Sequence, residues 1–214
     1  RILHAAILRT FDESSPPLSV ARHAERCGEN CRAADHYMTV AATAENRFLY
    51  VEAQQAYSSA LLNLEVDTLD LRVKALLGRS RVNYCVGRHD DALSDLKTAL
   101  PLAEQTGDLR SQIEMWLEQA TIQDWMFHYA VSSEAAAHAT RLAADLDDPQ
   151  IANRCALAVA RTTFREGAVS KAIDLLYVVE ENAARQADYT TRVIAMAILG
   201  GALAAEGKLV EAER

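Results

Sequence analysis

Five positions recur at a nearly constant spacing and constrain the fold more than any other feature of the sequence. Gly87, Phe127, Gly167 and Gly207 follow one another at intervals of 40 residues, and Phe48 precedes Gly87 by 39. A period of about 20 to 50 residues is typical of arrays in which one supersecondary unit stacks on the next. The sequence therefore predicts a repeat protein with a turn at each of these five positions.

Small residues flank each predicted turn at fixed distances, seven residues before it and five residues after it. The small positions before the turns are Ala41, Ser80, Ala120, Ala160 and Gly200, and those after the turns are Ala53, Ala92, Ser132, Ala172 and Ala212. Two helices approach closely only where small side chains meet. The pattern predicts an antiparallel helix hairpin around each turn, and it requires Ala120 and Ser132 to face each other.

The residue types at the turns predict two kinds of turn. Glycine adopts the left-handed backbone that ends a helix, so Gly87, Gly167 and Gly207 suit a tight connection. Phenylalanine lacks this freedom. We therefore expect the turns at Phe48 and Phe127 to be longer or differently built.

Helix-breaking and polar residues mark the expected junctions between hairpins, at Pro101 and at residues 106–108, 147–149 and 187–188. Such residues are typical of loops, and their spacing leaves room for helices of about 14 to 18 residues.

The chain ahead of the first turn predicts two short helices, at residues 2–11 and 18–27, separated by Ser14-Ser15-Pro16-Pro17. We expect residues 1–29 to cap the array and residues 30–214 to form about five hairpins, the last one truncated, within a single continuous domain.

The amino-acid composition favours helical structure and excludes several classes of function. Alanine occupies 39 of the 214 positions and aromatic residues make up 6%, which favours an all-α fold. The net charge of -8 argues against nucleic acid as a partner, because binding phosphates needs clustered cations. No apolar run is long enough to span a membrane. We expect a cytoplasmic chain with reduced cysteines, no cofactor and no membrane or nucleic-acid partner.

Three turns share a glycine followed five residues later by alanine, at residues 87–92, 167–172 and 207–212, and the last copy also carries Leu199-Gly200. These residues resemble the tetratricopeptide repeat (TPR), and the 40-residue period is similar to the long-helix variant of bacterial signalling proteins. The resemblance implies a right-handed α-solenoid of antiparallel helix hairpins, in which the first helix of each pair lines a concave groove.

A second resemblance covers the first 64 residues. Residues 3–5, 23–28, 33–37 and 46–48, followed by residues 53–61, look like the segment that follows the nucleotide-binding module in large signal-transduction ATPases, although Gly28-Glu29-Asn30 replaces the usual Gly-Asp-Trp. In that family the module sits beside a Ser/Thr kinase, a nucleotide cyclase or a LuxR-type output domain. The resemblance implies a regulatory fragment of a larger bacterial signalling protein.

Counting back from the turns places a set of charged and aromatic residues on the groove face of the first helices. The set comprises Lys74, Arg81, Tyr84, Glu114, Asp124, Trp125, Arg154, Arg161, Phe164 and Arg165. Guanidinium groups bind carboxylates through two hydrogen bonds and aromatic rings give rigid contact area, so this mixture suits an acidic peptide segment. A structural interpretation stays open, in which Tyr84 and Phe164 belong to the core and the arginines pair with neighbouring helices.

Three functions compete on these observations. The leading hypothesis is a non-catalytic module that binds a protein or peptide and regulates a neighbouring domain. The alternative is a sensor that encloses a small peptide or metabolite, which an apolar pocket around Trp125 and Phe164 would favour. An enzyme would need convergent titratable groups, and the nearest set, His128 and His138 with Asp124 and Glu134, is more typical of a polar surface.

Two further patterns stay open at this stage. His23, Cys27, Cys31 and His36 offer zinc-binding atoms, but their spacing favours ordinary packing. Polar residues also occupy positions where the repeat is usually apolar, namely Arg79, Asn83, Gln119 and Gln123. Either those helices are rotated or another chain covers that part of the array.

Overall fold

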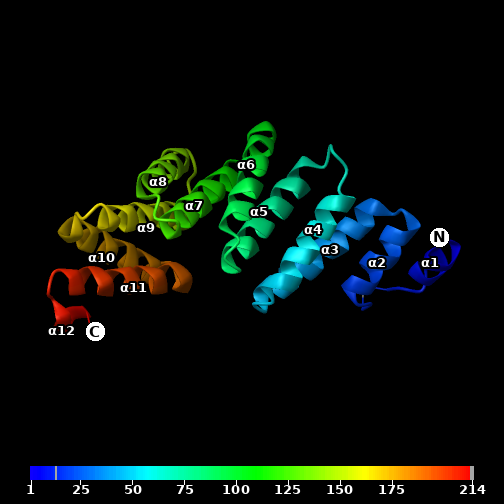
Figure 1. The fold of residues 1–214 in the computed structure, drawn as a ribbon, viewed down its shortest axis with the longest axis horizontal. Helices are drawn as coiled ribbons and strands as arrows, with labels where there is room; N and C mark the ends of the chain where they lie inside the picture. Colours follow the sequence, from blue (N-terminus) through cyan, green and yellow to red (C-terminus); the bar gives the residue numbers. More distant parts are fainter. Residues whose placement is uncertain (13, 213–214) are drawn as a thin grey trace. The chain divides into compact units, whose positions relative to one another are not determined.

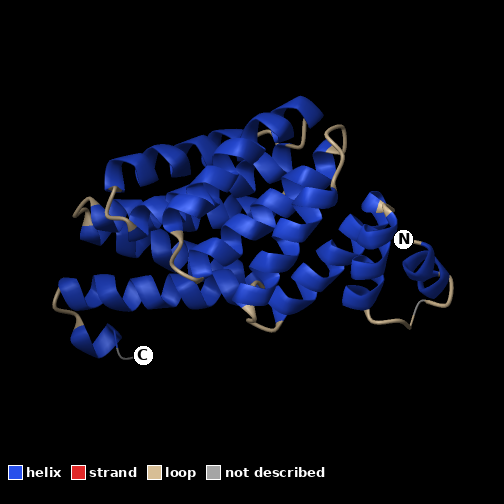
Figure 2. Cartoon of the chain, turned by 45° about the vertical axis from the view of Figure 1, so that its right-hand side comes forward, coloured by secondary structure: helices blue, strands red, loops and turns tan. Residues whose placement is uncertain are grey.

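The computed structural model describes residues 1–12 and 14–212, which form helices and no strands (Figures 1 and 2). The helices are α1 Ile2–Leu8, α2 Pro17–Cys27, α3 Asn30–Asn46, α4 Tyr50–Asn63, α5 Leu69–Cys85, α6 His89–Thr106, α7 Leu109–Trp125, α8 Tyr129–Ala143, α9 Pro149–Arg165, α10 Val169–Arg185, α11 Tyr189–Ala205 and α12 Leu209–Ala212. Helices α3 to α11 have 14 to 18 residues, the length that the sequence predicts. The fold is all-α and consists of TPR-like helix hairpins.

The small residues on either side of each turn meet as predicted. Ala120 and Ser132 are both completely buried, and the Ser132 hydroxyl donates a hydrogen bond to the Ala120 carbonyl oxygen at 2.7 Å. The equivalent Ser80 hydroxyl donates to the carbonyl oxygen of Ala92 at 3.1 Å. The close approach of paired helices at small side chains is therefore confirmed.

The five turns share one backbone geometry, so the expectation of different turns at the two phenylalanines is wrong. Phe48 and Phe127 have φ angles of 60° and 62°, in the same left-handed region as Gly87 at 78°. At every turn the turn residue donates to the carbonyl three residues back and the next residue donates to the carbonyl five residues back, a Schellman motif.

The packed helices enforce this turn even where the side chain opposes it. A left-handed conformation costs a residue with a side chain about 1–2 kcal/mol. Both phenylalanine side chains are 76% exposed, so they extend into solvent without disturbing the hairpin contacts. Helix packing therefore overrides the local preference of the turn residue.

The junctions lie near the predicted positions, with one correction. Gly107 ends α6 in the left-handed conformation, and the Asp148 carboxylate caps the start of α9 by accepting from the backbone N–H groups of Gln150 and Ile151. Pro101, however, lies inside α6 and ends no helix. Pro101 and Lys97, whose carbonyl loses its helical donor, are both exposed, so water can replace the missing bond.

The chain divides into two compact units, which we call unit 1 (residues 1–111) and unit 2 (residues 112–214). In unit 1 the Tyr57 ring lies over Gly78, where a Cβ atom would come within 2.4 Å of the ring, and its hydroxyl donates to Glu45. In unit 2 the core joins α9, α10 and α11 around Leu176, Val179 and Leu199. No helix among the described residues is both long enough and apolar enough to cross a membrane.

Candidate functional site

The predicted groove residues divide between the two units. Lys74, Arg81 and Tyr84 belong to unit 1, and the remaining members, Trp125, Arg154, Arg161, Phe164 and Arg165, belong to unit 2 together with Glu114 and Asp124. The unit 2 residues come from α7 and α9, the first helices of two consecutive hairpins.

A buried carboxylate gathers two of the predicted arginines in unit 2. The Asp124 side chain is only 3% exposed and lies on the last turn of α7. Arg165 of α9 donates to both carboxylate oxygens, through Nε at 2.9 Å and Nη2 at 3.2 Å. The Arg161 Nε atom lies 3.9 Å from the same carboxylate, and its Nη2 donates to the Thr121 hydroxyl at 3.1 Å. Asp124 therefore fixes the Arg165 guanidinium through two hydrogen bonds and attracts that of Arg161 through charge alone.

Arg165 combines fixed geometry with access to solvent. Its side chain is 40% exposed, and its guanidinium carbon lies 5.7 Å from the centre of the Tyr129 ring. The hydrogen bonds to Asp124, together with the charge of that carboxylate, raise the pKa of Arg165 above its ordinary value. A guanidinium held by a carboxylate on one side and a ring on another loses little side-chain entropy when it binds a ligand.

Arg154 extends this arrangement along α9. It lies seven residues before Arg161 and pairs with Glu114 of α7 at 3.6 Å. Three arginines of α9 thus meet two acidic residues of α7, Glu114 and Asp124. We call Arg154, Arg161, Arg165, Glu114 and Asp124 the arginine cluster.

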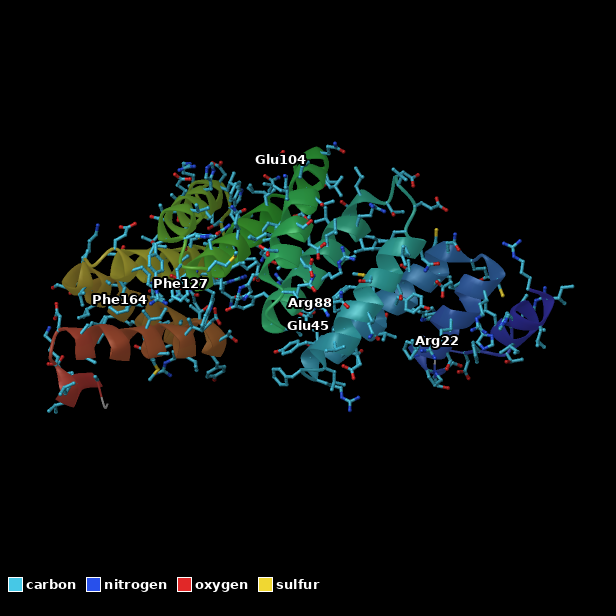
Figure 3. The ribbon with its side chains drawn as sticks, viewed as in Figure 1. Arg22, Glu45, Arg88, Glu104, Phe127 and Phe164 are labelled. Carbon is cyan, nitrogen blue, oxygen red and sulfur yellow. The ribbon has the colours of Figure 1, made fainter. Side chains whose placement is uncertain are left out.

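Exposed aromatic residues lie at the end of α7 and in the turn that follows. Trp125 is 61% exposed, and Phe127 is 76% exposed and stands edge-on to Tyr129 with ring centres 6.2 Å apart. Phe164, which is labelled with Phe127 in Figure 3, is instead half-buried and packs against the unit 2 core. The groove prediction omitted Phe127 and Tyr129, although the 40-residue period had already singled out Phe127.

The unit 1 members of the predicted set differ in their exposure. Lys74 is exposed, whereas Arg81 and Tyr84 are half-buried. The Tyr84 ring stacks on His89 with centres 5.8 Å apart.

The unexpected polar residues of α5 have a partner within their own hairpin. Arg79 donates to both oxygens of the buried Asp95 carboxylate, at 2.6 Å and 3.0 Å, and the Asn83 amide nitrogen donates to Asp95 at 3.1 Å. Arg79 also donates to the Ser58 hydroxyl of α4 at 3.2 Å. Hydrogen bonds from these α5 residues therefore connect α5 to α4 and α6, the second helices on either side of it.

The other candidate groups do not converge. His128 Nδ1 lies 2.8 Å from the Gln123 side-chain oxygen, His138 stacks on Trp116 with ring centres 4.6 Å apart, and Asp124 binds the arginines. His23 contacts His4 instead of a cysteine, with their Nδ1 atoms 3.0 Å apart. Among the described residues, no group of three or more His, Cys, Asp or Glu side chains could hold a metal ion.

Comparison with known proteins supports the fold but assigns no family. No family model matches the chain, and no curated protein sequence matches it. The structure is similar to BtubC (BKLC) from P. vanneervenii, with a TM-score of 0.69, 16% identity, and coverage of 90% of this chain and 82% of that one.

Two further solved structures are also similar. A Rap protein complexed with Competence and Sporulation Factor gives a TM-score of 0.73 at 15% identity, with 97% of this chain and 67% of that chain covered. A Signal Transduction ATPase with Numerous Domains (STAND) protein with a tetratricopeptide repeat sensor, from Pyrococcus horikoshii, gives 0.72 at 12% identity. The match covers 99% of this chain and only 36% of the STAND protein. At these identities the similarity establishes the TPR-like fold.

Proposed function

We propose that this chain is a non-catalytic, protein- or peptide-binding TPR module, and that unit 2 binds an acidic segment of its partner through the arginine cluster. The observation that carries the proposal is Arg165, which is fixed by two hydrogen bonds to buried Asp124 and lies over the Tyr129 ring, while 40% of its side chain is exposed. A preorganised, accessible guanidinium is the group best suited to bind a carboxylate through two hydrogen bonds.

The surroundings of Arg165 support docking of a polypeptide. Trp125 and Phe127 supply exposed aromatic area in the same hairpin as Asp124. Tryptophan, tyrosine and arginine are the residues that most often dominate protein interfaces. The partner is a protein or peptide segment, or a neighbouring domain of a longer chain, and neither nucleic acid nor membrane is part of the proposal.

The proposal also includes a regulatory context for the module. The module belongs to a larger cytoplasmic bacterial signalling protein with an ATPase or kinase domain. The resemblance of residues 1–64 to signal-transduction ATPases supports this context, as does the structural similarity to part of a STAND protein that has a TPR sensor. Binding at unit 2 then controls the attached output domain.

A sensor that encloses a small ligand is less well supported. That function calls for Trp125 and Phe164 to line an enclosed apolar pocket. Trp125 is 61% exposed, and Phe164 packs against the core of unit 2. The exposure of Trp125 favours docking of a chain over capture of a metabolite.

Peptide titration followed by tryptophan fluorescence tests the proposal. Trp116→Phe leaves Trp125 as the single reporter, because the chain has two tryptophans. A glutamate-rich peptide should change the Trp125 emission saturably, and its glutamine counterpart should not. Arg165→Gln should weaken binding about tenfold, the effect of losing one charge-assisted pair.

Arg185→Gln is the matched control, because Arg185 is an exposed arginine of α10 outside the arginine cluster. It removes the same charge from unit 2 and should leave the affinity within twofold, a difference of about 0.4 kcal/mol. Equal weakening by both variants, or equal binding of the glutamate and glutamine peptides, would contradict the assignment of this surface.

A further inference from the structure

Two of the five turns carry the same exposed aromatic pair, a phenylalanine followed two residues later by a tyrosine. Phe127 stands edge-on to Tyr129, with ring centres 6.2 Å apart and an angle of 79° between the rings. Phe48 stands edge-on to Tyr50 at 6.2 Å and 81°. Each phenylalanine side chain is 76% exposed, so the same arrangement of rings faces solvent at both turns.

The backbone at both phenylalanines is strained, and burial of the rings does not offset the strain. Their φ angles of 60° and 62° lie in the left-handed region, which disfavours residues with a side chain. Glycine occupies the equivalent position at the other three turns and adopts this conformation freely. Strained residues of this kind cluster at functional sites. A large apolar side chain that is kept at a strained, exposed position therefore indicates contact with another molecule.

An arginine distinguishes the aromatic pair of unit 2 from that of unit 1. Arg165 lies two residues before the next turn, and its guanidinium carbon is 5.7 Å from the centre of the Tyr129 ring. The equivalent residue in unit 1 is Cys85, whose side chain contacts Tyr50. In unit 2 a group that binds carboxylates and an exposed apolar ring thus lie on either side of one tyrosine.

This arrangement selects the residue that accompanies the carboxylate bound by Arg165. The positive charge of Arg165 disfavours a cationic side chain on the adjacent rings. Phe127 offers apolar area, which an uncharged aliphatic or aromatic side chain would remove from water. Alternate side chains of an extended segment lie on one face about 6.6 Å apart, a spacing similar to the 6.2 Å between the Phe127 and Tyr129 ring centres.

We propose that the segment bound by unit 2 carries an aliphatic or aromatic residue two positions from the acidic residue that pairs with Arg165, and that Phe127 binds this apolar side chain. The inference rests on the proposed binding of an acidic segment by the arginine cluster, and it names the second residue that this segment contains. The strained turn holds the Phe127 ring outside the hairpin, where the partner can reach it.

Two blocked heptapeptides test this preference on the complete 214-residue chain. Both have a central glutamate in a background of serine, and one of them has leucine at the second position on either side of the glutamate. This symmetry makes the direction of binding irrelevant. The Nε–H NMR signal of Arg165 reports the carboxylate contact. We expect the leucine peptide to bind with a dissociation constant on the order of 1 mM and about fivefold more tightly than the serine peptide, a difference of about 1 kcal/mol.

Phe127→Gly should change binding and stability in opposite directions. The substitution removes the ring and relieves the turn, so the leucine peptide should bind about fivefold more weakly while the Tm rises. Affinity for the serine peptide should change less than twofold, or about 0.4 kcal/mol. Phe48→Gly is the matched control, because it relieves the same strain in unit 1. It should also raise the Tm but leave both affinities within twofold.

Three results would overturn the proposal. They are the absence of saturable binding of the leucine peptide, equal binding of the leucine and serine peptides, and equal weakening by Phe48→Gly and Phe127→Gly. A third peptide, with both leucines and glutamine in place of glutamate, identifies which assignment is wrong. If it binds as well as the glutamate peptide, the acidic-segment function fails too. If it binds weakly while the two glutamate peptides bind equally, only the apolar preference at Phe127 is wrong.

Discussion

Units 1 and 2 each contain an arginine bound through two hydrogen bonds to a buried aspartate, but the two pairs connect different elements. In unit 1, Arg79 and Asp95 are 16 residues apart and join the two helices of one hairpin. In unit 2, Arg165 and Asp124 are 41 residues apart and join the first helices of consecutive hairpins. The same chemistry therefore stabilises a repeat in one unit and the contact between repeats in the other.

This difference separates two contributions to the stability of a repeat protein. Such stability is approximately the sum of the stabilities of single repeats and of the interfaces between neighbours. The Arg79 side chain is 25% exposed, whereas the Arg165 side chain is 40% exposed. An arginine between repeats can thus contribute to both stacking and ligand binding.

The largest expected effect comes from breaking the pair inside the hairpin. Asp95→Ala leaves Arg79 and the Asn83 amide nitrogen without their acceptor, and removal of one member of a buried pair costs about 3 kcal/mol. Urea unfolding measures this loss, and hydrogen exchange should place it in α5 and α6. The double variant Arg79→Met, Asp95→Leu should restore most of the stability, and a loss as large as that of Asp95→Ala would contradict the stranded-charge explanation.

Breaking the pair between hairpins should have a smaller effect. Arg165→Ala should lower the free energy of unfolding by about 1 kcal/mol, because Arg165 is partly solvated and Arg161 still faces Asp124. A double-mutant cycle with Asp124→Asn measures the coupling of the two residues. Hydrogen exchange should increase in α9 and remain unchanged in α5. A coupling energy near zero would show that Asp124 does not hold Arg165 in solution.

The turns provide a comparison that both units share. Phe48→Gly in unit 1 and Phe127→Gly in unit 2 should each raise the free energy of unfolding by about 0.5–1 kcal/mol, because glycine adopts the left-handed turn without strain. Gly87→Ala is the opposite substitution at an equivalent turn and should be destabilising by a similar amount. Thermal unfolding of the three variants checks both signs, and destabilisation by both glycine substitutions would show that the exposed rings support the fold.

Substitution of the two buried serines should give the smallest changes in the free energy of unfolding. Ser132→Ala should lower the free energy of unfolding by about 0.5 kcal/mol, at the low end for a hydrogen bond, because the Ala120 carbonyl keeps its helical partner. Ser80→Ala should be still milder, since its bond is 3.1 Å long against 2.7 Å for Ser132. Chemical denaturation compares the two, and a loss above about 2 kcal/mol in either would mean that the hydroxyl has a further buried partner.

The sequence predicted the structure best where the repeat period and the small size of the flanking residues indicate the same helix contact. The period and the small residues predicted the hairpins, the helix lengths and the contact between Ala120 and Ser132. The turns at Phe48 and Phe127 were predicted wrongly, because a rule for isolated turns does not include the tertiary packing that enforces them. Pro101 likewise marked a helix end that is absent, since an exposed helix face tolerates the lost hydrogen bond.

The sites were harder to predict than the fold because side-chain partners come from other helices. The sequence identified Arg79 and Asn83 as out of place but did not reveal Asp95 as their shared acceptor. It placed Arg161 and Arg165 on one face with Asp124, yet the distances that fix them depend on how α7 and α9 pack. Phe164 was assigned to the groove with a core position left open, because one helix pattern does not distinguish a core edge from an open surface, and it is half-buried against the unit 2 core.

The uniform backbone of the five turns has a consequence for how such a protein can change over time. Glycine and phenylalanine adopt the same turn conformation, so the identity of the turn residue does not determine whether the hairpin forms. Each repeat therefore has one outward position where substitutions of very different size leave the buried contacts intact. New specificity can accumulate there, one repeat at a time, while the architecture is inherited unaltered.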